Sequence, residues 1–344
     1  MQTETRSTSI EWYRSPIKAD ELKKLYVRSD LKGLAQSLGY LGTLFATGGV
    51  SLYSFYHWHW WTTVALVFFH GMCCAFCINA VHETGHLTVF KTKWLNIAFV
   101  HIFAFLGLIN HRMFETSHVR HHRSTLHPPD DLEVVVPIKT TLKDFLRFSF
   151  VNFNGPRYVF AFHFRVARGI FVGEWEDKLF PESNPERRLW ASRWSKTILI
   201  GQSAIVVAAL CTKLWLLPIL ITLSPFYGGW LFFLCNNTQH VGLQDNVSDF
   251  RLNTRTFTLN PIIRFLYWQM NYHTEHHMYV GVPCYNLGRL HRLIKDDLPP
   301  CPNGLTATWL EIHNILKKQA ADPTYVHIAS LPPFHSIVTS YVQN

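Results

Sequence analysis

Long uncharged apolar runs alternate with polar, basic segments along this 344-residue chain. Residues 34–56 and 62–81 form a first pair of runs, each long enough to cross a bilayer as a helix. Residues 197–212 and 214–235 form a second pair. Because the turn inside each pair is very short, each pair is predicted to be a transmembrane helical hairpin. The last helix is predicted to bend at its prolines.

A further apolar run covers residues 94–110, but its apolar core is only about fourteen residues long, which is short for a membrane span. That length is typical of a re-entrant or interfacial helix. We therefore predict that this segment does not cross the membrane, so that the polar segments on its two sides lie on the same face.

Lysine and arginine are distributed unevenly around these runs. The chain has 32 of them, and only Lys213 falls in the turn of a hairpin, so the other 31 lie in or beside the N-terminal segment, the middle loop and the C-terminal segment. By the positive-inside rule those three segments should face the cytoplasm. The first run follows a charged stretch too long for the n-region of a signal peptide, and is expected to act as a signal anchor.

These patterns predict an all-α integral membrane protein with four transmembrane helices in two hairpins and a cytoplasmic helical cap. The predicted regions are a cytoplasmic N-terminal segment (1–33), a membrane domain (34–293) and a cytoplasmic C-terminal tail (294–344). Charged residues make up only 16% of the chain, against roughly 25% in soluble proteins. The formal charge of +9 fits a face that meets anionic lipid and an acidic protein, and no nucleic-acid partner is expected.

Twenty histidines are present, and many of them are clustered. The clusters are HETGH at 82–86, HVRHH at 118–122 and HTEHH at 273–277, and a fourth element, NNTQH, lies at 236–240. On a helix, positions i, i+3 and i+4 share one face, so each cluster can present several imidazoles to a common centre. All four lie on the predicted cytoplasmic side. The candidate ligands are too many for one metal ion but suit two: His82, His86, His118, His121, His122, His240, His273, His276 and His277.

These boxes, an HxxxH followed by two HxxHH, resemble those of the membrane fatty acid desaturase and hydroxylase superfamily. Asn236 and His240 match the NxxxH element found between the second and third boxes of membrane desaturases, and the QHVGL run at 239–243 is similar to integral-membrane alkane hydroxylases. The stretches SHVRHHRSTLHPPDDLE and NYHTEHHMYVGVPCYNL look closest to acyl-lipid desaturases. The resemblance extends over the whole predicted membrane domain.

The resemblance implies that the nine histidines hold two iron ions, with Asn236 acting through a water molecule or as a weak ligand. Iron(II) with open positions binds O₂, and neutral donors leave a cationic centre that can be reduced. The implied reaction is O₂-dependent oxidation of an unactivated C–H bond in a fatty acyl or other lipid substrate. Desaturation to an alkene is the leading expectation, and a lipid or alkyl hydroxylase or ketolase of the same superfamily is the alternative.

Carboxylates close to the boxes are candidates for fixing the tautomers of the histidines. Each of them is also compatible with a solvated surface acid or a partner for an arginine. The candidates by sequence are Glu83, Asp130, Asp131, Asp245 and Glu275.

Electrons are expected from a separate donor, such as cytochrome b5 or ferredoxin with its reductase, because the segment before residue 34 is too short for a cytochrome domain. Such carriers are acidic, so the basic cytoplasmic face is suited to bind them. The expected membrane is the endoplasmic reticulum in a eukaryote and the inner membrane in a bacterium.

Two other classes of protein fit part of the pattern. Residues 82–86 also match HExxH, which would make the chain an intramembrane zinc protease. Zinc hydrolysis uses three protein ligands, however, so most of the clustered histidines would have no role. A metal or haem transporter would place its ligands at mid-membrane and show repeated halves, and the sequence has neither feature.

Overall fold

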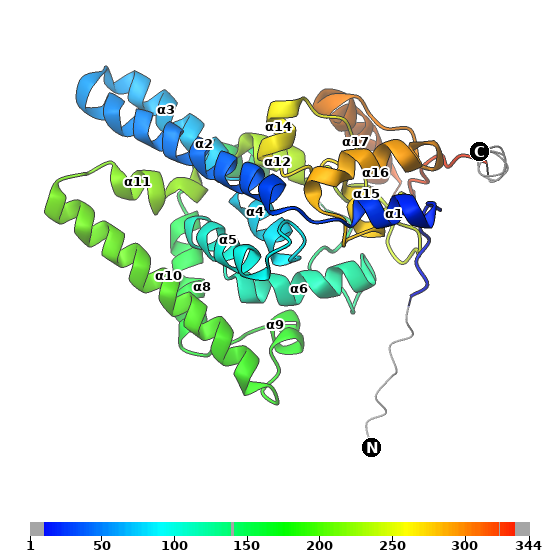
Figure 1. Cartoon of the computed structure of the whole chain (residues 1–344), viewed down its shortest axis with the longest axis horizontal. Coiled ribbons are helices and arrows are strands. Elements are labelled where there is room, and N and C mark those ends of the chain that lie inside the picture. The colour runs from blue at the N-terminus through cyan, green and yellow to red at the C-terminus, as the bar shows by residue number, and fades with distance from the viewer. Residues whose placement is uncertain (1–9, 139–140, 323, 334–344) are drawn as a thin grey trace.

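The computed structural model describes residues 10–138, 141–322 and 324–333. In those ranges the chain consists of helices and connecting segments, with isolated β-bridges and no strand. The all-α prediction is therefore confirmed. Two helical arms, α2–α3 and α10–α11, extend from a body of shorter helices that includes α4, α6 and α15 (Figure 1).

The first arm pairs α2 (Asp30–His57) with α3 (Trp60–Cys74), and α3 leads with a short break into α4 (Cys77–Gly85). The 26-residue segment Trp60–Gly85 is long and apolar enough to cross a membrane. Helix α2 has 28 residues but is not among the candidate spans, because glycine, serine and threonine dilute its apolar side chains. The predicted first hairpin therefore forms, but only its second helix has the composition of a span.

The second arm begins with α10 (Pro185–Thr212), the other helix that is long and apolar enough to cross a membrane. The returning segment is not one helix. It consists of three short pieces, α11 (Leu217–Ile221), the 3₁₀ turn η1 (Ser224–Phe226) and α12 (Trp230–Asn236). The predicted bend is thus a complete break, so residues 214–235 do not form one helix, and a fourth span there stays a prediction.

The break is held by a close approach of two backbones. Tyr227 is extended and Gly228 has a φ of +71°, so the chain passes from η1 to α12 without helical hydrogen bonds. A Cβ atom placed on Gly228 would lie only 2.4 Å from the carbonyl oxygen of Phe68 in α3. Hydropathy along the sequence carries no information about this contact, which explains why the segment looked like a span.

The short apolar run predicted to be re-entrant forms α5 (Lys93–Leu106), which is followed by α6 (His111–Ser124) at an angle of 109°. Asn110 fixes the bend: its Oδ1 accepts a hydrogen bond from the Met113 amide, and its Nδ2 donates to the Ala191 carbonyl in α10 at 2.9 Å. The pair is either a broken span or a re-entrant loop, so the described residues contain two candidate spans, or three if the pair counts as one.

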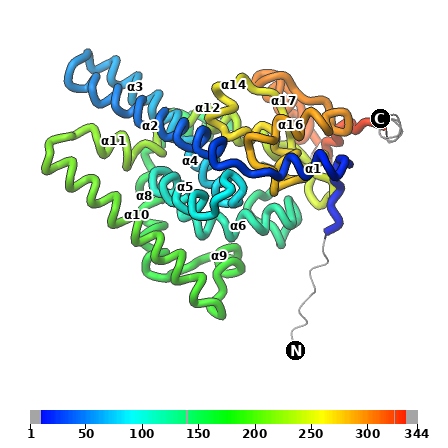
Figure 2. Tube along the Cα trace, viewed as in Figure 1, coloured from blue at the N-terminus to red at the C-terminus, as the bar shows by residue number. Residues whose placement is uncertain are grey.

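The remaining helices lie around the ends of the two arms that join the body of the molecule. The N-terminal part of the chain lies beside the C-terminal part (Figure 2). The side chain of Asn286 donates a hydrogen bond to the Leu25 carbonyl at 2.8 Å, and Trp309 donates to the Leu234 carbonyl at 3.0 Å. The predicted boundaries at residues 33 and 293 stay predictions. These helices are α1 (Ala19–Leu25), α7 (Leu142–Ser149), α8 (Gly155–Ala167), α9 (Glu174–Leu179), α13 (Phe250–Asn253), α14 (Pro261–Leu266), α15 (His273–Met278), α16 (Cys284–Ile294), the 3₁₀ turn η2 (Lys295–Asp297) and α17 (Gly304–Ala321).

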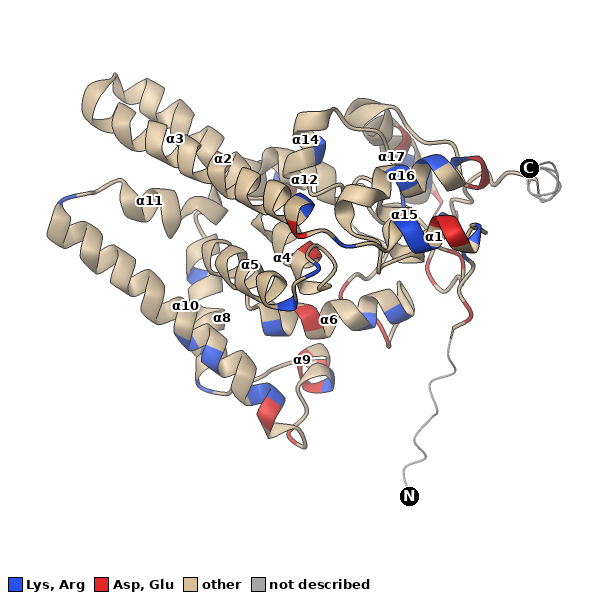
Figure 3. Cartoon of the chain, viewed as in Figure 1, with Lys and Arg blue, Asp and Glu red and all other residues tan. Residues whose placement is uncertain are grey.

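Charged side chains avoid the far ends of the two arms. Helices α2, α3, α10 and α11 are uncharged toward their tips except at one lysine, whereas the body of the molecule carries both signs of charge (Figure 3). That lysine is Lys213, the residue that ends α10. The hydroxyl of Tyr56 donates to the Lys213 carbonyl at 3.2 Å, so the two tips are neighbours.

Candidate metal centre

The nine predicted histidines converge from four elements: α4, α6, the turn after α12, and α15. They form two groups, and the candidate ligand atoms of each group lie within 4.8 Å of one another. The five-histidine group is His82, His86, His118, His122 and His276, and the four-histidine group is His121, His240, His273 and His277.

The second and third boxes each divide between the two groups. On α6, His118 and His122 are one helical turn apart and face the five-histidine group, whereas His121 faces the other group. On α15 the pattern is reversed, because His273 and His277 face the four-histidine group and His276 faces the five-histidine group. Each helix therefore lies between the two groups and contributes to both.

The spacing of the imidazole nitrogens fits two metal ions. Two nitrogens bound at about 2.1 Å to one ion, at right angles, would be roughly 3.0 Å apart. Four Nε2–Nε2 contacts are short, and each of them joins two histidines of the same group. These distances are 2.9 Å for His118–His122, 3.1 Å for His122–His276, 3.0 Å for His240–His273 and 3.1 Å for His273–His277.

Acidic side chains hold the outer nitrogens of the five-histidine group. Glu83 lies 2.8 Å from Nδ1 of His82 and 3.8 Å from Nδ1 of His276. Glu133 lies 2.7 Å from Nδ1 of His118, and its other oxygen accepts a hydrogen bond from Ser117. A partner at Nδ1 leaves Nε2 free to bind a metal. The Nε2 atom of His86 is buried and has no hydrogen-bond partner among the described residues, as expected of a ligand atom.

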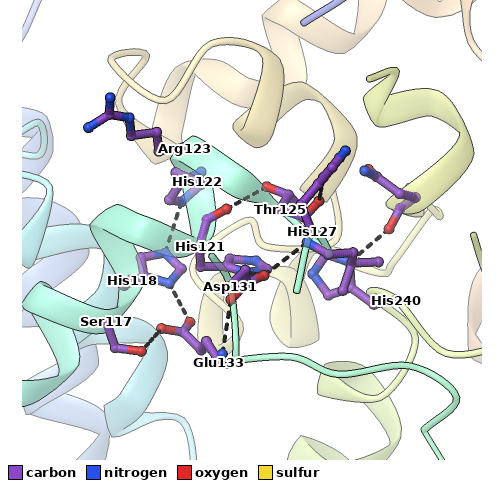
Figure 4. A network of polar contacts seen from close by, with 12 residues as sticks. Ser117, His118, His121, His122, Arg123, Thr125, His127, Asp131, Glu133 and His240 are labelled. Atoms are coloured by element: carbon purple, nitrogen blue, oxygen red, sulfur yellow. Dashed lines mark hydrogen bonds and ion pairs between the residues drawn. The ribbon is translucent and has the colours of Figure 1, made fainter. Parts of the chain in front are cut away.

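The four-histidine group is held by different acceptors. Asp131 lies 2.8 Å from Nδ1 of His121, and it also accepts the Leu126 amide at 2.9 Å. Nδ1 of His240 donates to the Asn253 carbonyl at 2.8 Å, and Nδ1 of His277 lies 3.1 Å from the Thr125 hydroxyl. Figure 4 shows the network that joins Glu133 and Asp131 to the histidines of α6.

Two of the five predicted carboxylates contact the centre, namely Glu83 and Asp131. Asp130 instead forms an exposed ion pair with Lys178, and Asp245 is exposed. Glu275 is buried but lies 2.5 Å from Nδ1 of His291, which belongs to neither group.

The sequence reasoning missed Glu133. It lies fifteen residues after His118, and the intervening turn at residues 125–131 brings it back against α6. The same turn supplies Thr125, which contacts His277. Only the position of Glu133 inside the stretch that resembles desaturases could have pointed to it.

Burial sets the protonation of the candidate ligands that lie outside the candidate spans. It lowers the pKa of His240 to about 3, and it lowers the pKa values of His273 and His277 well below 6.5, with the neighbouring histidines adding to the effect. These imidazoles are therefore neutral at physiological pH, the form that binds metal. Burial raises the pKa of Asp131, but the hydrogen bond and charge of His121 outweigh it and keep that pKa below the usual value.

The fold and the site define a helical protein with candidate membrane spans and a buried pair of all-nitrogen histidine groups. Comparison with known families matches residues 58–308 to the fatty acid desaturase family, and the match includes all nine histidines. The chain belongs to that family, which confirms the resemblance seen in the sequence. A comparison with curated proteins finds no match. Family membership implies an oxidoreductase that acts on lipids, and together with the apolar helices it indicates a membrane protein.

Proposed function

We propose that this protein is a di-iron enzyme that uses O₂ to oxidise an unactivated C–H bond of a fatty acyl or other lipid substrate, with desaturation as the leading reaction. The observation that carries the proposal is the division of nine histidines, seven buried and two half-buried, into two neighbouring groups with the nitrogen spacing of metal ligands. Bound iron would supply a reducible centre able to activate O₂ for removal of hydrogen from a methylene group. The histidines hold the ions, and Glu83, Asp131 and Glu133 orient the imidazoles.

A cavity of about 520 Å³ supports a hydrocarbon substrate, because its size is in the range of ligand pockets and its lining is mostly apolar. Ile78, which lines it, lies one helical turn before His82 on α4. Asn237, which also lines it, follows Asn236, the residue that we propose as a weak or water-mediated ligand. These walls would position an alkyl chain beside the centre and exclude water. Other lining residues are Cys74, Cys77, Leu108, Phe148 and Phe232.

The arm tips carry one lysine and no other charge, which supports a topology in which both tips face away from the cytoplasm and the metal centre lies on the cytoplasmic side. The membrane would be the endoplasmic reticulum or a bacterial inner membrane. Electrons would come from a separate carrier such as cytochrome b5 or ferredoxin, supplied by its reductase.

A hydroxylase or ketolase would use the same histidine groups and the same cavity, so it remains the second candidate. The zinc protease is disfavoured by Glu83. A protease base must face the water on the metal, whereas the Glu83 carboxylate is fully buried behind His82, at its outer Nδ1 atom.

Metal and product analysis of detergent-purified protein tests the proposal, with a His121→Ala variant beside the wild type. We expect two iron ions per wild-type chain, fewer in the variant, and an alkene product from added lipid with reductant and O₂. A single zinc ion that His121→Ala leaves in place would overturn the di-iron proposal. An alcohol product with two iron ions would instead favour the hydroxylase.

A further inference from the structure

Two stacked aromatic rings connect the protein surface to the four-histidine group. Trp12 is partly exposed, and its ring stacks on Phe250 with centroids 4.2 Å apart and planes 8° from parallel. Phe250 is buried, and its ring centroid lies 5.4 Å from that of His277. The path from the surface to a candidate iron ligand is therefore two rings long, with neighbouring rings in contact.

Several contacts hold Trp12 in this position. Its Nε1 donates a hydrogen bond to the Arg123 carbonyl at 3.1 Å, and the edge of His127 packs against its ring at 5.3 Å between centroids. The next residue, Tyr13, donates its amide to the Ser248 carbonyl at 2.9 Å and places its ring 3.8 Å from the Arg251 guanidinium. The N-terminal segment is thus fixed on the chain around Phe250, and the ring stack is part of a packed structure.

The proposed reaction needs a supply of electrons. Reduction of O₂ to two water molecules takes four electrons: two leave the substrate with its hydrogens when the alkene forms, and two come from outside together with two protons. Hydroxylation also needs two electrons from outside. Each one-electron carrier gives up one electron and is oxidised, so two carriers serve each turnover by reducing two iron(III) ions to iron(II).

We propose that Trp12 and Phe250 form the route by which an acidic one-electron carrier protein delivers these electrons to the iron of the four-histidine group. This inference rests on the proposed di-iron function. Electron tunnelling weakens steeply with distance and is favoured by packed rings over empty space, and this stack supplies contiguous rings between surface and centre.

Charge beside Trp12 suits an acidic partner. Arg14 and Arg123 are both exposed, and both lie next to Trp12, one by sequence and one through the hydrogen bond to its carbonyl. Figure 4 shows the Arg123 side chain pointing away from the Asp131 and Glu133 carboxylates. Complementary charge speeds the encounter of protein partners and orients them. The exposed edge of Trp12 would then lie within the docked interface.

The test compares Trp12→Leu with Trp12→Phe. Leucine fills space and keeps an apolar contact with Phe250, whereas phenylalanine also keeps a stacked ring. Iron-loaded protein without O₂ is mixed in a stopped-flow instrument with the reduced soluble domain of cytochrome b5, and separately with a reduced [2Fe–2S] ferredoxin. The rate of carrier oxidation is recorded per bound iron. We expect Trp12→Leu to slow electron transfer several-fold, and Trp12→Phe to restore most of the rate.

Reduction by dithionite, a small molecule that needs no docking site, separates this inference from the proposed function. Wild type and both variants should be reduced by dithionite equally. If the protein contained no iron that dithionite can reduce, the di-iron proposal would fail. If dithionite reduced the iron but Trp12→Leu accepted carrier electrons as fast as wild type, the ring path would be overturned.

The docking part of the proposal has its own variant. Arg123→Glu should slow carrier oxidation about tenfold at low ionic strength, with the difference shrinking as salt is added. Lys317→Glu, an equal charge change at an exposed residue of α17, is the matched control and should leave the rate near wild type. Equal effects of the two variants would overturn a docking site beside Trp12.

Discussion

The five-histidine group and the four-histidine group differ in what lies behind their imidazoles. Two glutamates, Glu83 and Glu133, back the five-histidine group. The four-histidine group has one carboxylate, Asp131, and otherwise a peptide carbonyl and a hydroxyl. An imidazole whose Nδ1 atom is paired with a carboxylate binds a metal ion more strongly through Nε2 than one paired with a neutral group. The negative charge of the carboxylate also stabilises a nearby cation. We therefore expect the five-histidine group to hold its ion more tightly.

The difference suggests that ions bound at the two groups would have different roles. The four-histidine group has one imidazole fewer, so an ion there would keep more positions open. It is also the group that Phe250 contacts through His277. The ion of the five-histidine group would then be held more firmly, and the ion of the four-histidine group would exchange more readily.

Removing one ligand from each group gives the largest expected effect. His118→Ala should weaken iron binding at the five-histidine group and His273→Ala at the four-histidine group, each lowering the iron content of that group and lowering product formation by more than about 100-fold. Iron analysis and product chromatography measure the two outcomes. Loss of both ions from both variants would show that the groups bind metal as one unit, and the comparison would fail.

Neutralising the carboxylates should have a smaller effect that is specific to one group. Glu133→Gln should weaken iron binding at the five-histidine group, and Asp131→Asn at the four-histidine group, each by about 10- to 100-fold. Competition with a chelator of known affinity measures the change. Asp130→Asn is the matched control, since exposed Asp130 forms an ion pair only with the half-buried Lys178 among the described residues. An equal loss in that variant would point to a general effect of surface charge.

Arg255 gives the smallest and sharpest test. Its guanidinium donates to the Thr238 carbonyl at 2.7 Å and the Val241 carbonyl at 3.1 Å, and so holds the turn that carries His240. Arg255→Lys keeps the charge but loses the forked geometry. It should lower iron affinity several-fold at the four-histidine group alone, as measured by chelator competition. A change at the five-histidine group would mean that Arg255 supports both groups.

Much of the site could be predicted because the spacing of histidines within one helix determines which of them face the same way. Spacings of three and four residues bring imidazoles to one helix face, and all nine predicted histidines do converge. Their division between two groups could not be predicted. The side chains of His121 and His122 differ by one helical step, and only the packing of α6 against α15 decides which group each of them joins.

The fold could be predicted from the sequence where local composition determines the structure. It could not be predicted where packing against a distant segment determines it. The run that forms α5 is short, and the structure bends it sharply into α6, although whether the pair crosses a membrane stays a prediction. The returning segment of the second arm is as apolar as a span, yet it breaks at Gly228, because its partner in the fold is the backbone of α3. Asp131 could be predicted because it lies close to the second histidine box in the sequence. The contact of Glu133 with His118 could not, because it depends on the path of the loop between them.

The contact between the break at Gly228 and helix α3 also determines which substitutions the protein can accept during evolution. A Cβ on Gly71 would lie 2.3 Å from the Tyr227 ring, and one on Gly228 would meet backbone atoms of α3. On α2, by contrast, a Cβ on Gly42 or Gly49 meets no atom within 4 Å. In a library of all single substitutions, the first two glycines should therefore be nearly invariant among folded members, whereas the two on α2 should vary freely. Among these four positions, the same amino acid would mark a fixed point of the fold at two and free surface at the other two.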